Sequence, residues 1–300
     1  MKKKLIFTLS NFNLTLQQTF SHKNTKQLTI LIFDSGVGGL SIFSKVKQIL
    51  PNARYLYMFD NQAFPYGEKS KQFITDRVIT IISIMSRLHQ FDLIIIACNT
   101  VSTTVSMSML RALFPFPIIG VVPAIKLAAK STRNKVVGLL ATRGTLESNY
   151  THNLINQFAR NCRILHLKAA NLVSITEAKL HGKLVSMSAL FNILSPWLGT
   201  IDSPDTIVLG CTHFPLLNFE LRKILPRRTN FIDSGLAVAQ RVLWTVKQDI
   251  NLNMRSKIIA EGPNKVYCSA ITSKTITLAP TLKRYGFSSL EVLNLNSKKK

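Results

Sequence analysis

Short hydrophobic runs alternate along this chain with stretches in which apolar side chains recur at helical spacing. The runs are apolar on both faces, which is typical of strands that helices cover on both sides. The stretch 76–90, DRVITIISIMSRLHQ, has the helical spacing. Strands that alternate with helices predict an α/β fold with mainly parallel sheets. The predicted strands are 27–33, 53–59, 93–97, 118–122, 136–141, 163–167, 206–210 and 230–232.

Polar, small or reactive residues follow these strands at their carboxyl ends, where ligands bind in parallel α/β sheets. The two halves of the chain also echo each other, since IIIACNT (94–100) resembles IVLGCTH (207–213) and FDSG (33–36) resembles IDSG (232–235). We therefore expect two duplicated α/β halves that face one cleft. The residues at the strand ends are Asp34-Ser35-Gly36, Asp60, Pro65-Tyr66-Gly67, Cys98-Asn99-Thr100, Thr142-Arg143-Gly144-Thr145 and Cys211-Thr212-His213.

Cys98 and Cys211 are the most informative of these residues. Each directly follows a strand and precedes a turn or helix, where backbone N–H groups lower a thiol pKa from ~8.5 into the range ~3.5–7.5. A cysteine protease would need one thiol, one histidine and an oxyanion hole, which leaves the second thiol unexplained. A metal site would need more clustered Cys and His ligands than the sequence contains. Two equivalent thiols fit better a two-base proton transfer, in which one thiol takes a proton from carbon and the other returns one to the opposite face.

Other carboxylates and hydroxyls suit the thiol protons and a small zwitterionic ligand. Asp34, Glu177 and His213 are candidates to hold or accept thiol protons. The glycines of GVGG (36–39) match neither a dinucleotide fingerprint nor a lysine-bearing phosphate loop, so we expect them to let the backbone approach a small ligand and to start a helix. Neutral hydrogen bonds are offered by Ser35, Asn99, Thr100, Thr145, Thr212 and the Tyr66-Gly67 backbone.

The charge is strongly positive, with 38 Lys and Arg against 14 Asp and Glu, a net charge of +24 and a pI near 10.2. Such a field attracts polyanions. The basic residues are nevertheless dispersed, with short runs only at Lys2–Lys4, Arg222–Arg228 and Lys298–Lys300, and no nucleic-acid-binding motif accompanies them. We therefore do not expect nucleic acid to be a functional ligand.

The cysteines and the amino-terminal segment indicate a cytoplasmic location. The four cysteines lie far apart with no CxxC pair, which favours free thiols in a reducing compartment. The start, MKKKLIFTLSNFNLTL, has a short apolar stretch that Thr8 and Asn11 interrupt, unlike an export signal. No apolar run approaches the ~18 residues of a membrane span, so we expect no membrane association.

Taken together, these motifs resemble those of the glutamate racemases, cofactor-independent members of the aspartate/glutamate racemase superfamily. They occur in the family's order and cover nearly everything from about residue 28 to 292. DSG, PYG, CNT and GCTH are specific only in combination. The matching stretches are FDSGVGGLS (33–41), DNQAFPYGEKS (60–70), ACNT (97–100), GVVPAIK (120–126), GLLATRGT (138–145), TEAKLHGK (176–183), LGCTHFPLL (209–217) and IDSG (232–235).

The resemblance implies an activity and a role for each motif. It implies interconversion of L- and D-glutamate without pyridoxal phosphate or a metal, to supply D-glutamate for peptidoglycan. Cys98 would work on D-glutamate and Cys211 on L-glutamate, supported by Asp34, Glu177 and His213. The substrate site would be lined by Asp34, Ser35, Tyr66, Gly67, Asn99, Thr100, Thr212 and His213.

The resemblance also implies two pseudo-symmetric α/β domains with the active site in the cleft between them. The expected division is an amino-terminal extension (1–27), a first domain (28–122 plus 233–300) that the carboxy-terminal segment closes, and a second domain (123–232). The TEAKLHGK motif and the extension resemble the subtype activated by UDP-N-acetylmuramoyl-L-alanine. The chain could be a monomer or a homodimer.

The sequence departs from the family in three respects. Val101 stands where alanine is common, the segment 246–280 matches poorly, and the basic charge is unusual. Two alternatives stay open: an aspartate racemase of the same superfamily, and a basic interaction protein whose racemase site has decayed.

Overall fold

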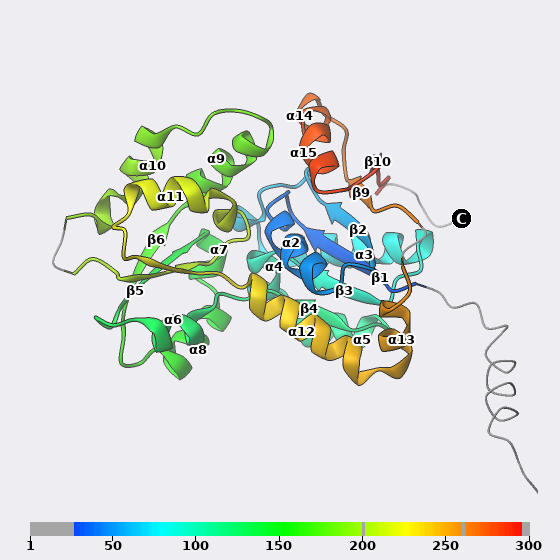
Figure 1. The fold of residues 1–300 in the computed structure, drawn as a ribbon, viewed down its shortest axis with the longest axis horizontal. Helices are drawn as coiled ribbons and strands as arrows, with labels where there is room; N and C mark the ends of the chain where they lie inside the picture. Colours follow the sequence, from blue (N-terminus) through cyan, green and yellow to red (C-terminus); the bar gives the residue numbers. More distant parts are fainter. Residues whose placement is uncertain (1–26, 200–201, 260–261, 296–300) are drawn as a thin grey trace, which may run out of the picture.

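The computed structural model describes residues 27–199, 202–259 and 262–295. The expected amino-terminal extension therefore lies outside the described residues except for Gln27, as do the terminal lysine runs. Two sheets organise the described chain, one in each half of the molecule in Figure 1, and every strand pair in them is parallel. The α/β fold with parallel sheets is thus confirmed.

The first sheet has six strands in the order β10-β9-β2-β1-β3-β4. The fully buried β1 pairs with β2 and β3, so that Ile32 lies opposite both Tyr57 and Ile95. Successive β1 residues enter two different core clusters, Ile30 and Ile32 one and Leu31 and Phe33 the other, as expected for a strand covered on both faces. Its strands are β1 (Thr29–Asp34), β2 (Arg54–Phe59), β3 (Leu93–Ile96), β4 (Ile118–Gly120), β9 (Lys265–Cys268) and β10 (Ser289–Val292).

The second sheet has four strands in the order β6-β5-β7-β8: β5 (Val136–Ala141), β6 (Arg163–Lys168), β7 (Thr206–Leu209) and β8 (Asn230–Ile232). Its order along the chain is second, first, third, fourth, the same as that of β1–β4. Cys98 and Cys211 therefore follow equivalent third strands. FDSG and IDSG do not correspond, because the first follows β1 and the second follows β8.

Helices fill the connections. The predicted helix 76–90 lies mostly within α3, which begins earlier because the Ser70 hydroxyl accepts a hydrogen bond from the Phe73 N–H and caps the first turn. In the first half the helices are α2 (Leu40–Ile49), η1 (Tyr66–Glu68), α3 (Lys71–Leu88), α4 (Asn99–Thr104), α5 (Met107–Leu113), α12 (Gly235–Gln248), α13 (Ile250–Ser256), α14 (Ser273–Thr277) and α15 (Ala279–Arg284). In the second half they are α6 (Ile125–Ser131), α7 (Arg143–Leu146), α8 (Asn149–Phe158), α9 (Ala170–Leu180), α10 (Met187–Leu194), η2 (Ser195–Trp197), η3 (Phe214–Leu217) and α11 (Asn218–Ile224).

The carboxy-terminal segment returns to the first sheet. After β8 the chain forms α12, which packs on α2, and then adds β9 beside β2 and β10 beside β9. These two strands lie where the family resemblance is weakest or ends, and the hydrophobic pattern did not predict them. The domain boundaries at 122 and 232 remain a prediction.

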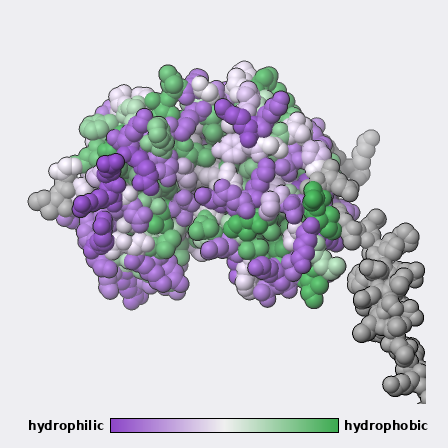
Figure 2. All heavy atoms as spheres, in the orientation of Figure 1, coloured by the Kyte–Doolittle hydropathy of each residue, from purple (hydrophilic) through white to green (hydrophobic). Residues whose placement is uncertain are grey.

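Hydrophilic residues cover much of both halves on the face shown in Figure 2, with apolar residues in smaller groups. In the part of the chain that the structure describes, no helix combines the length and the apolar character needed to cross a membrane.

Candidate active site

Strand register brings the predicted site residues together. In the first sheet Phe33 pairs with Ile96, and the Ala97 N–H donates to the Phe33 carbonyl oxygen at 2.7 Å, so Asp34 and Cys98 emerge side by side. In the second sheet the Gly210 N–H donates to the Leu140 carbonyl oxygen at 2.8 Å. Thr142 and Cys211 therefore leave that sheet together as well.

Both thiols line one small pocket between the two sheets. Cys98 and Cys211 are both buried and free. The pocket brings together most of the predicted residues, although Thr145 and Glu177 are not part of its wall. Its lining residues are Asp34, Ser35, Phe64, Pro65, Tyr66, Gly67, Cys98, Asn99, Thr100, Thr142, Val173, Cys211, Thr212 and His213.

The Cys98 thiol lies at the amino-terminal end of α4, 3.6 Å from the Ser35 hydroxyl oxygen. Burial raises the pKa of Cys98 well above its ordinary value, and the nearby Asp34 carboxylate raises it further. Hydrogen bonds from the Val101 N–H and Ser35 lower it but do not compensate. The expectation of a lowered pKa is therefore wrong for Cys98, because desolvation outweighs the backbone N–H groups.

Asp34 accepts hydrogen bonds from the Ser35 and Gly39 N–H groups, both at 2.6 Å, and from the Thr212 hydroxyl at 3.3 Å. The last of these comes from the second half of the chain. Complete burial raises the pKa of Asp34 to about 6, against the lowering effect of His213 and of these hydrogen bonds. Asp34 thus lies between Cys98 and the second half of the site. Because its pKa is raised, it holds its proton more tightly than an ordinary carboxyl group.

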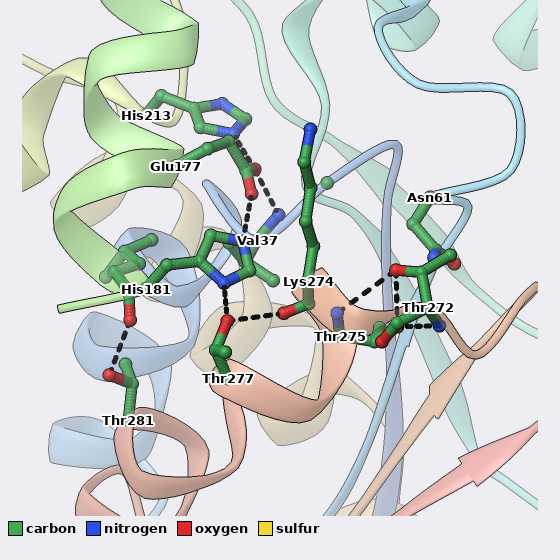
Figure 3. Close-up of polar contacts among 12 residues, drawn as sticks. Val37, Asn61, Glu177, His181, His213, Thr272, Lys274, Thr275, Thr277 and Thr281 are labelled. Atoms are coloured by element: carbon green, nitrogen blue, oxygen red, sulfur yellow. Dashed lines mark hydrogen bonds and ion pairs between the residues drawn. The ribbon is translucent and has the colours of Figure 1, made fainter. Parts of the chain in front are cut away.

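On the other side of the pocket, Cys211, His213 and Glu177 form a chain of contacts. The Cys211 sulfur lies 3.6 Å from His213 Nδ1, and His213 Nε2 lies 2.7 Å from Glu177 Oε1. The Val37 N–H donates to the same carboxylate oxygen at 3.1 Å, which joins α9 to the loop after β1 (Figure 3).

His213 and Glu177 stabilise each other's charged form. Burial alone would lower the pKa of His213, but its hydrogen bonds with Cys211 and Glu177 raise it well above its ordinary value. Burial would raise the pKa of Glu177, yet the hydrogen bonds from His213 and Val37 hold that pKa below its ordinary value. Both directions describe an imidazolium–carboxylate pair whose positive ring lies against the Cys211 sulfur.

Two glycines of GVGG make room for this pair. A Cβ atom on Gly38 would lie 2.2 Å from His213 Nδ1, and one on Gly36 would lie 2.7 Å from Glu177 Oε1. We expected these glycines to let backbone approach a ligand. Gly39 directly precedes α2, in agreement with the expected helix start, and Gly36 and Gly38 let the carboxylate and the histidine of the second half pack against the first.

Threonine hydroxyls join the two halves at the pocket wall. Thr100 and Thr142 share a hydrogen bond of 3.0 Å, and Thr142 donates to the fully buried Thr145 at 3.3 Å. Thr142, Phe64 and Val173 line the pocket although they were not among the candidate residues. Thr142 was marked by its place at a strand end and Phe64 by the stretch DNQAFPYGEKS, whereas no local pattern marks Val173.

Three other candidates have particular surroundings. The Tyr66 hydroxyl donates to Asp60 at 2.6 Å, so it is already paired. Asn99 Oδ1 is buried, and within the described chain no group bonds to it. The Val101 side chain is fully buried in the core and is not part of the pocket lining.

In the described ranges, no group of three His, Cys, Asp or Glu side chains has the arrangement of a metal site. The arrangement places two sulfur atoms on one pocket, with an ionisable group near each: Asp34 near Cys98 and His213 next to Cys211. Such a site can move protons to and from a carbon atom.

Comparison with known proteins agrees with this chemistry. Residues 37–242 match the family described as Asp/Glu/Hydantoin racemase. The chain is 56% identical over 271 residues to a glutamate racemase of Sodalis glossinidius, covering 90% of this chain and 92% of that one. It is 54% identical over 267 residues to one of Pectobacterium atrosepticum, covering 89% and 92%.

A solved structure extends the similarity to the fold. It is the crystal structure of Escherichia coli glutamate racemase in complex with L-glutamate and the activator UDP-MurNAc-ala. The two chains are 49% identical with a TM-score of 0.83, and the match covers 89% of this chain and 98% of that one.

Proposed function

The chain belongs to the Asp/Glu/Hydantoin racemase family, and we infer that it interconverts L-glutamate and D-glutamate by moving the α-proton between two thiols. The observation that carries this inference is the placement of Cys98 and Cys211, after equivalent strands of two sheets, on one pocket. A substrate between them would present one face of its α-carbon to each sulfur. Racemisation requires removal of a proton from one face and delivery to the other.

The surroundings of the two sulfur atoms suit opposite tasks. The positive His213 ring stabilises negative charge on Cys211, which favours proton removal from L-glutamate on that side. The raised pKa of Cys98 keeps its proton in place, ready for delivery to the opposite face of the carbanion. In the reverse reaction a Cys98 thiolate would be a strong base for the same reason, as the weakly acidic α-hydrogen of D-glutamate demands.

Substrate binding draws on the neutral groups of the pocket. The unpartnered Asn99 Oδ1 is a buried acceptor, and leaving such an atom unpaired costs about 1–3 kcal/mol. A substrate ammonium group would satisfy it. Ser35, Thr100, Thr142 and Thr212 place hydroxyls on the same pocket. To bind a substrate carboxylate, Thr142 and Thr212 would turn from the partners to which they donate here, Thr145 and Asp34.

The wider role follows from the reaction. We propose that the protein acts in the cytoplasm and supplies D-glutamate for peptidoglycan synthesis. Its 49% identity to the E. coli enzyme solved with UDP-MurNAc-ala supports the same nucleotide as an activator here. We also propose the division into two domains that the sequence suggested, with residues 123–232 as the second.

One experiment tests the reaction, the substrate and the need for a cofactor. The purified protein is incubated with L-glutamate in D₂O without added cofactor, and we expect D-glutamate that carries deuterium at the α-carbon. A parallel incubation with L-aspartate identifies the alternative substrate. No exchange and no racemisation of glutamate, in a folded protein, would refute the proposed function and favour a decayed site.

A further inference from the structure

Asp60 is a polar strand-end residue that does not line the pocket. Its backbone N–H donates to the Asp34 carbonyl oxygen at 3.1 Å, which places it beside the pocket. Its side chain is fully buried and is bound by Arg77 of α3. Arg77 Nε donates to Asp60 Oδ2 at 2.8 Å and Arg77 Nη2 donates to Asp60 Oδ1 at 2.7 Å, the two parallel bonds of a bidentate pair. Arg77 Nη2 also donates to Gln62 Oε1 at 3.1 Å.

One hydrogen bond connects this pair to the substrate pocket. The Tyr66 hydroxyl donates to Asp60 Oδ2 at 2.6 Å. Tyr66 belongs to one wall of the pocket, which consists of the consecutive residues 64–67. Burial raises the pKa of Tyr66 well above its ordinary value and the Asp60 charge raises it further, so the hydroxyl keeps the hydrogen that it donates. The 64–67 wall is thus tied to Asp60 through this hydroxyl.

Arg77 closes the segment that contains the wall. The chain runs from Asp60 through the 64–67 wall into α3, and Arg77 reaches back to Asp60 from the second turn of that helix. The start of the segment is held separately, because Asn61 Nδ2 donates to the Ala270 carbonyl oxygen at 2.7 Å and the Ala270 N–H donates to Asn61 Oδ1 at 3.1 Å. The backbone beside Asp60 therefore has a fixed place, and the Asp60 side chain transmits that place to the wall.

The charge of Arg77 keeps Asp60 in its ionised form. Burial alone would raise the pKa of Asp60, but hydrogen bonds, those from Arg77 foremost, hold it below its ordinary value. An ionised carboxylate only accepts hydrogen bonds, so it can receive those from both Arg77 and Tyr66. Without the guanidinium group the buried carboxylate would lack its counter-charge, and it would take up a proton or draw in water. Either change alters the partner of the Tyr66 hydroxyl.

We propose that Asp60 and Arg77 are positioning residues for substrate binding: the pair holds the Tyr66 hydroxyl and so fixes the 64–67 wall of the pocket against which glutamate binds. The hydroxyl of Tyr66 then maintains the shape of the pocket and does not itself bind substrate. The inference rests on the proposed function, since the ligand of the wall is the glutamate assigned there.

Three variants and one control separate this role from the general stability of the fold. Arg77→Met removes the charge, Arg77→Lys keeps the charge but not the two parallel bonds, and Tyr66→Phe keeps the ring and removes the hydroxyl. The matched control is Arg255→Met. Arg255 Nη1 bonds to Asp92 Oδ1, another mostly buried aspartate of the first sheet. Asp92 precedes β3, so this pair lies at the edge of the sheet opposite the pocket.

The measurements are kcat and KM for L- and D-glutamate, with thermal unfolding to check that each variant is folded. We expect Arg77→Met to raise KM about tenfold, the size of losing one hydrogen bond to a charged group. The value of kcat should stay nearly unchanged, because both thiols keep their surroundings and only uniform binding is lost. KM must then rise by the same factor for both enantiomers, since their free energies are equal. Arg77→Lys should raise KM less, and Arg255→Met should leave it unchanged.

A double-mutant cycle tests whether Arg77 acts through Tyr66. Tyr66→Phe alone should raise KM about as much as Arg77→Met does, because it breaks the same link at its other end. In the double variant KM should rise little beyond either single value, so the two effects should not add. If Arg77→Met does not fold, Arg77→Lys takes its place in the cycle.

Unchanged KM in a folded Arg77→Met or Tyr66→Phe variant would overturn the proposal. Increases that add in the double variant, or an equal rise of KM in Arg255→Met, would overturn it as well. An unmodified protein that does not racemise glutamate would instead refute the proposed function itself.

Discussion

Replacing Gly38 with alanine tests the active-site geometry most directly, because it adds a single methyl group and alters neither thiol. The new Cβ would lie 2.2 Å from His213 Nδ1 and 2.6 Å from its two neighbouring ring carbons. The imidazole is buried and held between Glu177 and Cys211, so the ring cannot remain in place. Either the ring or the loop after β1 must move.

The magnitude follows from what the displaced ring does. Moving it breaks the 2.7 Å bond to Glu177 and the 3.6 Å contact with Cys211. Loss of a positioned acid or base typically costs ~10²–10⁴-fold in rate, so we expect kcat/KM to fall at least about 100-fold, or about 2.7 kcal/mol. Overpacking costs about 1–3 kcal/mol of stability, which leaves a domain of ordinary stability folded.

A double-mutant cycle identifies the cause. His213→Asn, Gly38→Ala and the double variant are compared by kcat/KM from polarimetry in both directions. Because asparagine is smaller than the imidazole, adding Gly38→Ala to His213→Asn should cost little further activity, and the two effects should not add. Gly262→Ala is the control, since its Cβ would approach no atom closer than 3.3 Å.

Full activity in Gly38→Ala would refute the contact between the loop after β1 and His213. Additive losses in the double variant would show that the methyl group acts on something other than the histidine. A loss of the same size in Gly262→Ala would point to a general sensitivity of the fold.

Cys98→Ala and Cys211→Ala should each abolish racemisation, because one remaining thiol cannot serve both faces of the α-carbon; full activity of either in a chiral assay of product would refute the two-thiol scheme. A second prediction concerns pH, since burial raises the pKa of Asp34 from 3.8 to about 6 and the folded protein therefore binds a proton that the unfolded chain releases. This group contributes stability below about pH 4 that is lost as the pH rises through 6, by up to about 3 kcal/mol. Urea unfolding at pH 4 and pH 7 gives the change in the free energy of unfolding between the two pH values, and Asp34→Asn should remove the part due to Asp34. An unchanged difference would contradict a buried carboxyl group with a raised pKa.

The strands and their polar ends could be predicted from the sequence. Within the described residues, eight of the ten strands coincide with predicted hydrophobic runs. The fully buried β1, β5 and β7 do so because a strand covered on both faces must be apolar along its whole length. The missing two are β9, with the sequence KVYC, and β10, with SLEV. Both are short and contain charged residues. Their place in the sheet depends on the edges they meet, because β9 pairs with β2 and β10 then pairs with β9.

The sequence by itself therefore determined the α/β class, the alternation of elements and the two thiols at strand ends, since each of these depends on neighbouring residues. Only the tertiary structure decided how distant segments meet, as in Gly38 against His213 and Glu177 against Val37. It also decided that the pKa of Cys98 is raised, where the local pattern predicted that it would be lowered. The pKa of a buried group and a contact across a cleft both depend on residues that are distant in the sequence. The local order of residues along one strand therefore does not predict them.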